Sequence, residues 1–247
     1  MAQMTLEQLV ERLRSALGDG LRAVVLYGSA AGVEHHAAHS DYNVFVLVDR
    51  LGRAELGPPM AKLTAVWREG GNPPLLLLTM SEWRGSADIF PMEYADIFER
   101  HQVLYGALPR DGIVVAPANL RLQVEHESMA KLLQLRTGLL QAGKDDKRQR
   151  ALLAASLSTF MAIFRGIERL HEAVPPADYE SLVKSVARRA GFDPDPWVRV
   201  VRHRRGNDRL EEPEQVLGAY LEGAEKLVAY LDVFTPGNER TGGDRVE

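Results

Sequence analysis

The sequence predicts an α+β protein, with a mixed sheet and its helices in the first part and a helical bundle in the second. Two observations lead to this prediction. Up to residue 116, short apolar runs of strand length alternate with amphipathic stretches of helical period, as in sheets covered by helices. After that point only helical periodicity recurs, over longer stretches. We expect domains at 1–116 and 117–234, and a disordered tail at 235–247.

The first part is expected to contain three helices and four strands. Thr5 and Gln8 have the spacing of a capping box, so the first helix is expected to begin after Thr5 and to end at Gly18. Proline-containing breaks precede the other two helices, at 60–68 and 93–100. Apolar runs of strand length lie at 22–27, 42–48, 75–79 and 102–105.

The second part is expected to contain five helices. Apolar residues recur there at three and four positions, so that each helix has one apolar face. The expected helices span 120–140, 151–170, 179–190, 195–203 and 213–233. The three tryptophans, Trp67, Trp83 and Trp197, are interpreted as packing residues.

Composition excludes several classes of protein. The chain has 247 residues and no cysteine, which excludes disulfides and thiolate metal sites. Its net charge of −4 provides no basic field, so a nucleic-acid partner is not expected. We find neither a signal peptide nor an apolar run long enough to span a membrane, so we expect a cytoplasmic protein without membrane contact.

The most informative segment is a Gly-Ser turn after a strand, followed by an acid at the start of the next strand. Gly28 lets the backbone approach a phosphate closely, and the N–H groups of the Gly28-Ser29 turn can surround an anion. A helix beginning near Ala30 would direct its positive end to the same place. Asp41 and Asn43 are two residues apart, so on a strand they point to one face. Both offer oxygen, the ligand atom that magnesium prefers.

This segment, from Val24 to Val48, resembles the signature of the nucleotidyltransferase superfamily, the polymerase-beta-like fold. In that family a Gly-Ser turn holds a nucleoside triphosphate and an Asp-x-Asp pair holds magnesium. The resemblance implies a nucleotidyltransferase-fold domain that uses Mg²⁺ and takes a nucleoside triphosphate as substrate. The resemblance assigns nucleotide binding to Gly28, Ser29 and Ser40. It assigns the metal to Asp41 and Asn43, and Asp41 is also the expected catalytic residue.

Two of the carboxylates that the family usually has are missing from the expected positions of this sequence. Asn43 stands where a second aspartate is expected, and its amide brings no charge. The family also supplies a third acid from a later strand, whereas the run 75–79 contains none. Three interpretations stay open: one tightly held metal, a carboxylate contributed by Glu93, Asp96 or Glu125, or a domain that binds a nucleotide without chemistry.

The predicted function is therefore transfer of a nucleoside monophosphate from a magnesium-bound nucleoside triphosphate to a hydroxyl group. The acceptor, a small molecule or a protein, and the oligomeric state are left open. The alternative is a catalytically degenerate nucleotide-binding protein, or an antitoxin-like partner protein. The helical domain is expected to complete an acceptor pocket, as in related branches of the family.

Three further patterns have a functional and a plain interpretation. The loop histidines His35, His36 and His39 suit a transition metal or an exposed polar loop. The basic run Arg199, Arg202 and His203 suits a triphosphate or a solvated helix end. The pair Arg165 and His171 matches a short motif of helical ribonucleases, which also occurs by chance.

Overall fold

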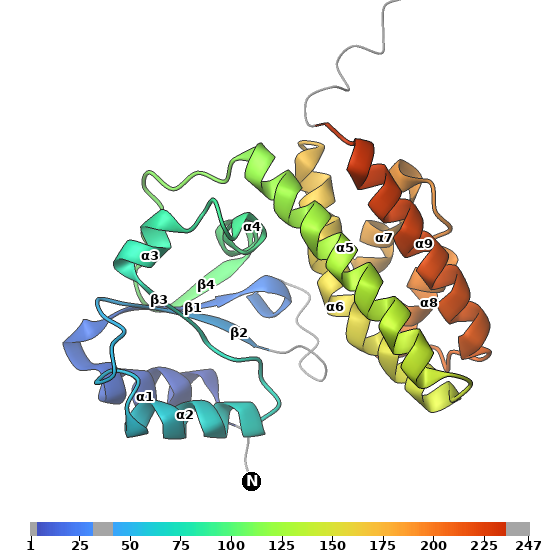
Figure 1. Cartoon of the computed structure of the whole chain (residues 1–247). Coiled ribbons are helices and arrows are strands. Elements are labelled where there is room, and N and C mark those ends of the chain that lie inside the picture. The colour runs from blue at the N-terminus through green and yellow to red at the C-terminus, as the bar shows by residue number, and fades with distance from the viewer. Residues whose placement is uncertain (1–3, 32–41, 236–247) are drawn as a thin grey trace, which may run out of the picture. The chain divides into compact units, whose positions relative to one another are not determined.

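The chain forms two compact units, Met1–Val115 and Ala116–Glu247 (Figure 1). The computed structural model describes residues 4–31 and 42–235. Apart from Thr235, the tail expected at 235–247 lies outside these ranges.

The first unit contains the expected strands and α-helices, together with one α-helix that the sequence analysis missed and two short 3-10 helices, labelled η. Its elements are α1 (Leu6–Leu17), η1 (Gly18–Gly20), β1 (Leu21–Tyr27), η2 (Gly28–Ala31), β2 (Asn43–Val48), α2 (Pro58–Glu69), β3 (Leu76–Thr79), α3 (Met80–Gly85), α4 (Pro91–Glu99) and β4 (His101–Gly106). The missed helix α3 has only six residues, too few for a visible period. A capping box between Thr79 and Glu82 begins it, as one between Thr5 and Gln8 begins α1.

The four strands form a mixed sheet in the order β3-β2-β1-β4. Strand β1 is antiparallel to both β2 and β4, and β2 is parallel to β3. The carboxyl end of β1 therefore lies beside the first residues of β2 and β4. This end of the sheet carries the Gly-Ser turn, because η2 follows β1 directly.

Each face of the sheet is buried under two helices (Figure 1). Alternate strand residues such as Val24 and Val46 pack in one core with Trp67 of α2 and with residues of α1. Their neighbours Val25 and Phe45 pack on the opposite face, in a core of residues from α3 and α4. The near-continuous apolar runs of β1 and β2 follow from burial on both faces.

The second unit consists of the five expected helices in its described residues. These are α5 (Pro117–Ala142), α6 (Asp146–Leu170), α7 (Tyr179–Ala190), α8 (Asp195–Arg204) and α9 (Pro213–Val233). Buried residues recur along the whole of α6, which packs against the other four helices. Trp197 of α8 stacks on Tyr220 of α9 with ring centroids 3.7 Å apart. All three tryptophans are fully buried, which confirms their interpretation as packing residues.

One described helix, α6, is long and apolar enough to cross a membrane by length and composition alone. Within its most apolar window, 56% of the residues are buried inside the protein. Its place at the centre of the bundle accounts for this composition.

Candidate functional site

Gly28 and Asn43 meet at the end of the sheet. Gly28 is buried and has a φ of +80°, a conformation that residues with a side chain rarely adopt. A Cβ atom at this position would lie 3.3 Å from Nδ2 of Asn43. The turn therefore requires glycine for its backbone conformation, and the side-chain amide of Asn43 lies beside it.

The Gly-Ser turn is a 3-10 helix of four residues, Gly28–Ala31. The N–H of Gly28 donates to the carbonyl of Arg100 over 3.1 Å, so this group is not available to a phosphate. This N–H instead anchors η2 to the chain just before β4, so the predicted anion-binding turn would have to use the N–H groups that follow Gly28. The expected helix beginning near Ala30 would continue into residues 32–41, which lie outside the described residues, so it stays a prediction.

Several predicted site residues lie outside the described residues. These are Ser40, Asp41 and the three loop histidines, His35, His36 and His39. Of Ser29, the structure describes the backbone but not the side chain. Among the predicted site residues, the structure describes both the backbone and the surroundings of Gly28 and Asn43.

Asn43 begins a row of polar residues across the sheet. Tyr27 is the cross-strand partner of Asn43 in β2 and of His101 in β4. Residues directly opposite each other in antiparallel strands share a face, so the three side chains belong to one face of the sheet. This is the face that α3 and α4 cover, because Asn43 and Tyr27 alternate with Val44 and Leu26 of the opposite core.

The phenol of Tyr27 lies within electrostatic range of two carboxylates of α4. Burial, together with the smaller effect of the negative charges of Glu93 and Asp96, raises the pKa of Tyr27 to about 12. Glu93 and Asp96 are three residues apart and share one side of α4, and both are half-buried. Their effect on Tyr27 associates them with the polar end of the sheet.

Strand β3 does not supply the third carboxylate. Leu76 and Leu78 of β3 are the partners of Phe45 and Leu47, so this strand offers only apolar side chains to the face that carries Asn43. Glu125 belongs to the second unit, where it pairs with Arg121 over 2.9 Å. Among the described residues, no three His, Asp or Glu side chains are grouped so that they could hold a metal ion.

The basic run on α8 is engaged inside the second unit. Arg202 donates to both carboxylate oxygens of Glu180, over 3.1 and 2.8 Å. Arg199 lies 3.6 Å from the carboxylate of Asp208, and the ring of His203 contacts the carbonyl of the same residue over 2.8 Å. These contacts favour a structural role for the run over phosphate binding.

The ribonuclease-like pair is also part of the packing of this unit. His171 forms a hydrogen bond with the hydroxyl of Tyr230 and packs on the ring of Phe234, with centroids 4.8 Å apart. His171 therefore packs against the end of α9, which favours the chance interpretation of the motif.

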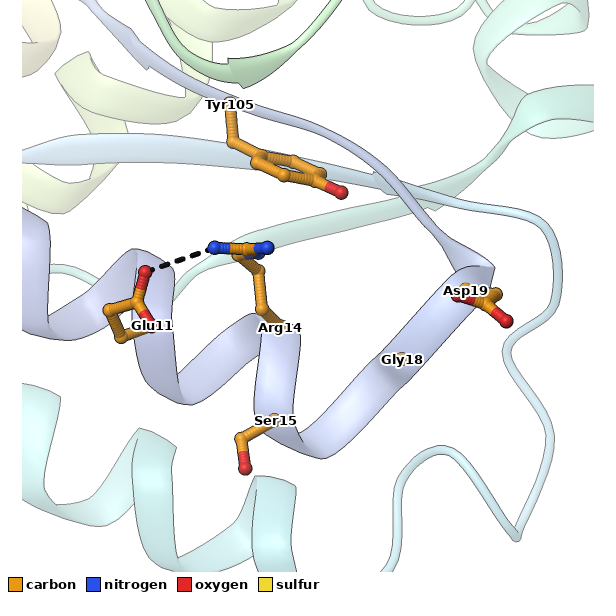
Figure 2. A pocket seen from close by; sticks show the side chains of 6 residues that line it. All are labelled: Glu11, Arg14, Ser15, Gly18, Asp19 and Tyr105. Carbon is orange, nitrogen blue, oxygen red and sulfur yellow. Dashed lines mark hydrogen bonds and ion pairs between the residues drawn. The ribbon is translucent and has the colours of Figure 1, made fainter.

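A hollow of about 360 Å³ lies among residues of α1, η1 and β4 (Figure 2). Its lining residues are Glu11, Arg14, Ser15, Gly18, Asp19 and Tyr105. The guanidinium of Arg14 lies 5.3 Å from the ring centre of Tyr105. It also forms an ion pair with the carboxylate of Glu11 over 3.1 Å. Neither Gly28 nor Asn43 lines this hollow, so it is not part of the candidate site.

Comparison with solved structures identifies the fold. The crystal structure of spectinomycin adenyltransferase AAD(9) from Enterococcus faecialis, with ATP and spectinomycin, matches with a TM-score of 0.59 at 11% sequence identity. The match covers 92% of this chain and 100% of that one. No family model and no curated protein matches the sequence. The chain has the nucleotidyltransferase fold followed by a helical region, which confirms the fold predicted from the sequence.

Proposed function

We propose that this protein transfers a nucleoside monophosphate from a nucleoside triphosphate to a hydroxyl group of a small molecule. The observation that carries the proposal is the contact between Gly28 and Asn43, which joins the Gly-Ser turn to the first residue of β2. Asp41, two residues before Asn43, would belong to the same place. The likeness to AAD(9), whose crystal structure contains ATP and spectinomycin, supports this proposal at the level of the fold.

In this proposal the turn binds the phosphates. The N–H of Gly28 is engaged with Arg100, so the donors would be the N–H groups that follow it in η2 together with the hydroxyls of Ser29 and Ser40. Nucleotidyl transfer needs alignment and charge neutralisation more than covalent help. The rigid attachment of η2 to the chain before β4 would supply the alignment.

Asp41 and Asn43 would hold a magnesium ion, which would supply positive charge beside the phosphates. The amide oxygen of Asn43 is a suitable ligand atom, but the residue leaves the site one negative charge short. We propose that Glu93 and Asp96 provide the missing negative charge. The raised pKa of Tyr27 supports their presence at this end of the sheet.

We propose a small molecule as the acceptor, in preference to a protein. The support for this choice is AAD(9), which matches the chain over both its sheet-containing and its helical parts and whose structure contains a small molecule besides ATP.

A second candidate function is nucleotide binding without transfer. Two observations favour it: the neutral amide of Asn43, and the apolar face of β3, where Leu76 and Leu78 occupy the positions beside β2. In this case the same turn would bind a triphosphate, but the chain would lack the carboxylates that activate an acceptor hydroxyl.

Two measurements test these functions in sequence. Calorimetric titration with a non-hydrolysable ATP analogue and magnesium should show binding by the wild type and its loss in Asp41→Ala. A screen of small hydroxyl compounds with labelled ATP should then show transfer of the labelled monophosphate. Binding without any transfer supports the second function, whereas a folded wild type that binds no triphosphate overturns both.

A further inference from the structure

A stripe of large apolar side chains lies exposed along α5 in the second unit. It consists of Leu122, Met129, Leu133 and Leu140, whose exposures are 65%, 44%, 53% and 84%. Because successive helical residues turn by about 100°, these four lie within about 20° of one line along the helix. Exposed apolar stripes of this kind are typical of interaction sites.

The opposite side of α5 holds the helix in its own bundle. Leu120, Val124 and Leu135 are buried there. The stripe is therefore not a poorly packed core face, since the core of this unit takes its side chains from the other side. A second apolar surface on one helix needs its own explanation.

The stripe has the spacing of a coiled-coil seam that is symmetric along its length. Its residues are separated by seven, four and seven positions, which places Met129 and Leu133 at equal distances from the centre, and Leu122 and Leu140 likewise. Two antiparallel copies related by a two-fold axis at this centre would pack Leu122 on Leu140 of the partner subunit. Met129 would pack on Leu133 of the partner subunit, in the same way.

Charges beside the stripe fit the same arrangement. Glu125 and Arg136 lie on one flank of the stripe. The two-fold axis would place Glu125 opposite position 137 of the second copy, which is one residue after Arg136. Glu125 would thus lie close to Arg136 of the partner subunit. Within the chain these side chains already pair with Arg121 and Glu225, over 2.9 and 2.8 Å, and both pairs lie near the protein surface. A contact across the axis would extend them into a network of alternating sign.

We propose that α5 forms a two-fold antiparallel contact between two copies of this chain, centred between Met129 and Leu133. Self-complementarity selects a second copy as the occupant, because a different partner would not require the apolar and charged positions to be symmetric about one point. The contact would extend over about 27 Å, the length of 18 helical residues.

Cysteine cross-linking of the full chain tests this register directly, because the natural sequence has no cysteine. Leu122→Cys and Leu140→Cys proteins are purified reduced, mixed and oxidised gently. The proposal predicts a disulfide-linked heterodimer in the mixture and little cross-linking of either protein alone. Within the antiparallel pair, identical positions lie about 27 Å apart, far beyond the 4.4–6.8 Å between Cα atoms that a disulfide requires.

Sedimentation measures the same contact without cysteine. Wild type is expected to be a dimer at micromolar concentration, and Leu133→Glu a monomer with an unchanged far-ultraviolet spectrum, because the side chain is exposed in the single chain. Val174→Glu is the matched control, since Val174 is 85% exposed but outside α5, and it should leave the dimer intact. A wild type that is monomeric at 100 µM, or cross-linking of Leu122→Cys with itself, overturns the proposal.

Discussion

The side-chain amide of Asn43 lies against Gly28, 3.3 Å from the point that a Cβ atom on Gly28 would occupy. The contact links two segments that are fifteen residues apart in the chain, through the pairing of β1 with β2. It places the side-chain amide of Asn43 beside the Gly-Ser turn, where the proposed function puts the phosphates and the metal. Both residues can therefore be varied separately to test one site.

Gly28→Ala should abolish nucleotide binding and lower the free energy of unfolding by about 1–2 kcal/mol, the cost of a left-handed backbone for alanine. The added methyl group would also press on Nδ2 of Asn43. Gly71→Ala is the matched control, because Gly71 has a φ of +83° but no atom within 4 Å of its Cβ position. Urea unfolding and calorimetric titration of both variants should show similar losses of stability but a loss of binding only in Gly28→Ala.

Asn43→Asp should strengthen magnesium-dependent nucleotide binding about tenfold, or about 1.4 kcal/mol, because it adds a carboxylate of the same shape. Titration with the ATP analogue at several magnesium concentrations measures the effect, and Asn43→Ala should act in the opposite direction. Equal affinities for wild type and Asn43→Asp at every magnesium concentration would show that position 43 is not a metal ligand.

Local patterns in the sequence predicted most of the fold. The strands were visible because β1 and β2 are buried on both faces and so consist of apolar runs. The capping box of Thr5 and Gln8 identified the start of α1, and both of its hydrogen bonds are present at 3.2 Å. Helix α3 was missed because its start depends on a short capping interaction after a strand, with no period to reveal it.

The candidate site was only partly predictable, because two of its features depend on contacts between distant segments. That the Gly28 N–H is engaged follows from the pairing of β1 with β4, which brings Arg100 beside it. The effect of Glu93 and Asp96 on Tyr27 follows from the packing of α4 on the sheet. Neither contact can be predicted from the spacing of residues in a motif, because that spacing does not show which distant segments pack together.

Tyr27 should make the protein less stable in strong alkali. Its pKa is about 12 in the folded protein against 10.0 ordinarily, so the unfolded chain releases this proton first as the pH rises. The stability from the protonated phenol is complete below pH 10 and is lost between pH 10 and 12, by at most about 1.4 kcal/mol per pH unit. Tyr27→Phe should make this loss shallower, which urea unfolding at a series of alkaline pH values measures.

The same tyrosine reports on the two acids of α4. Glu93→Gln and Asp96→Asn each remove a negative charge that raises the pKa of Tyr27. Each variant should lower that pKa in a spectrophotometric titration, with the fold unchanged by circular dichroism. Glu99→Gln is the control, since Glu99 is on the same helix but is not among the charges that raise this pKa. A Tyr27 pKa that is unchanged in both variants would remove the acids from the site.

Glu168 and Arg189 join α6 to α7 through a buried ion pair. The side chain of Glu168 is 2% exposed, and both of its oxygens accept from Arg189 over 3.3 Å. Arg189→Leu should lower the free energy of unfolding by about 3 kcal/mol, because it leaves a buried carboxylate without its counter-charge. Replacing both residues by leucine should recover most of this loss, since an apolar pair of similar volume requires no desolvation of charge. Urea unfolding of the single and double variants measures both effects. A double variant as unstable as the single one would show that the loss comes from packing around the guanidinium and not from the buried charge.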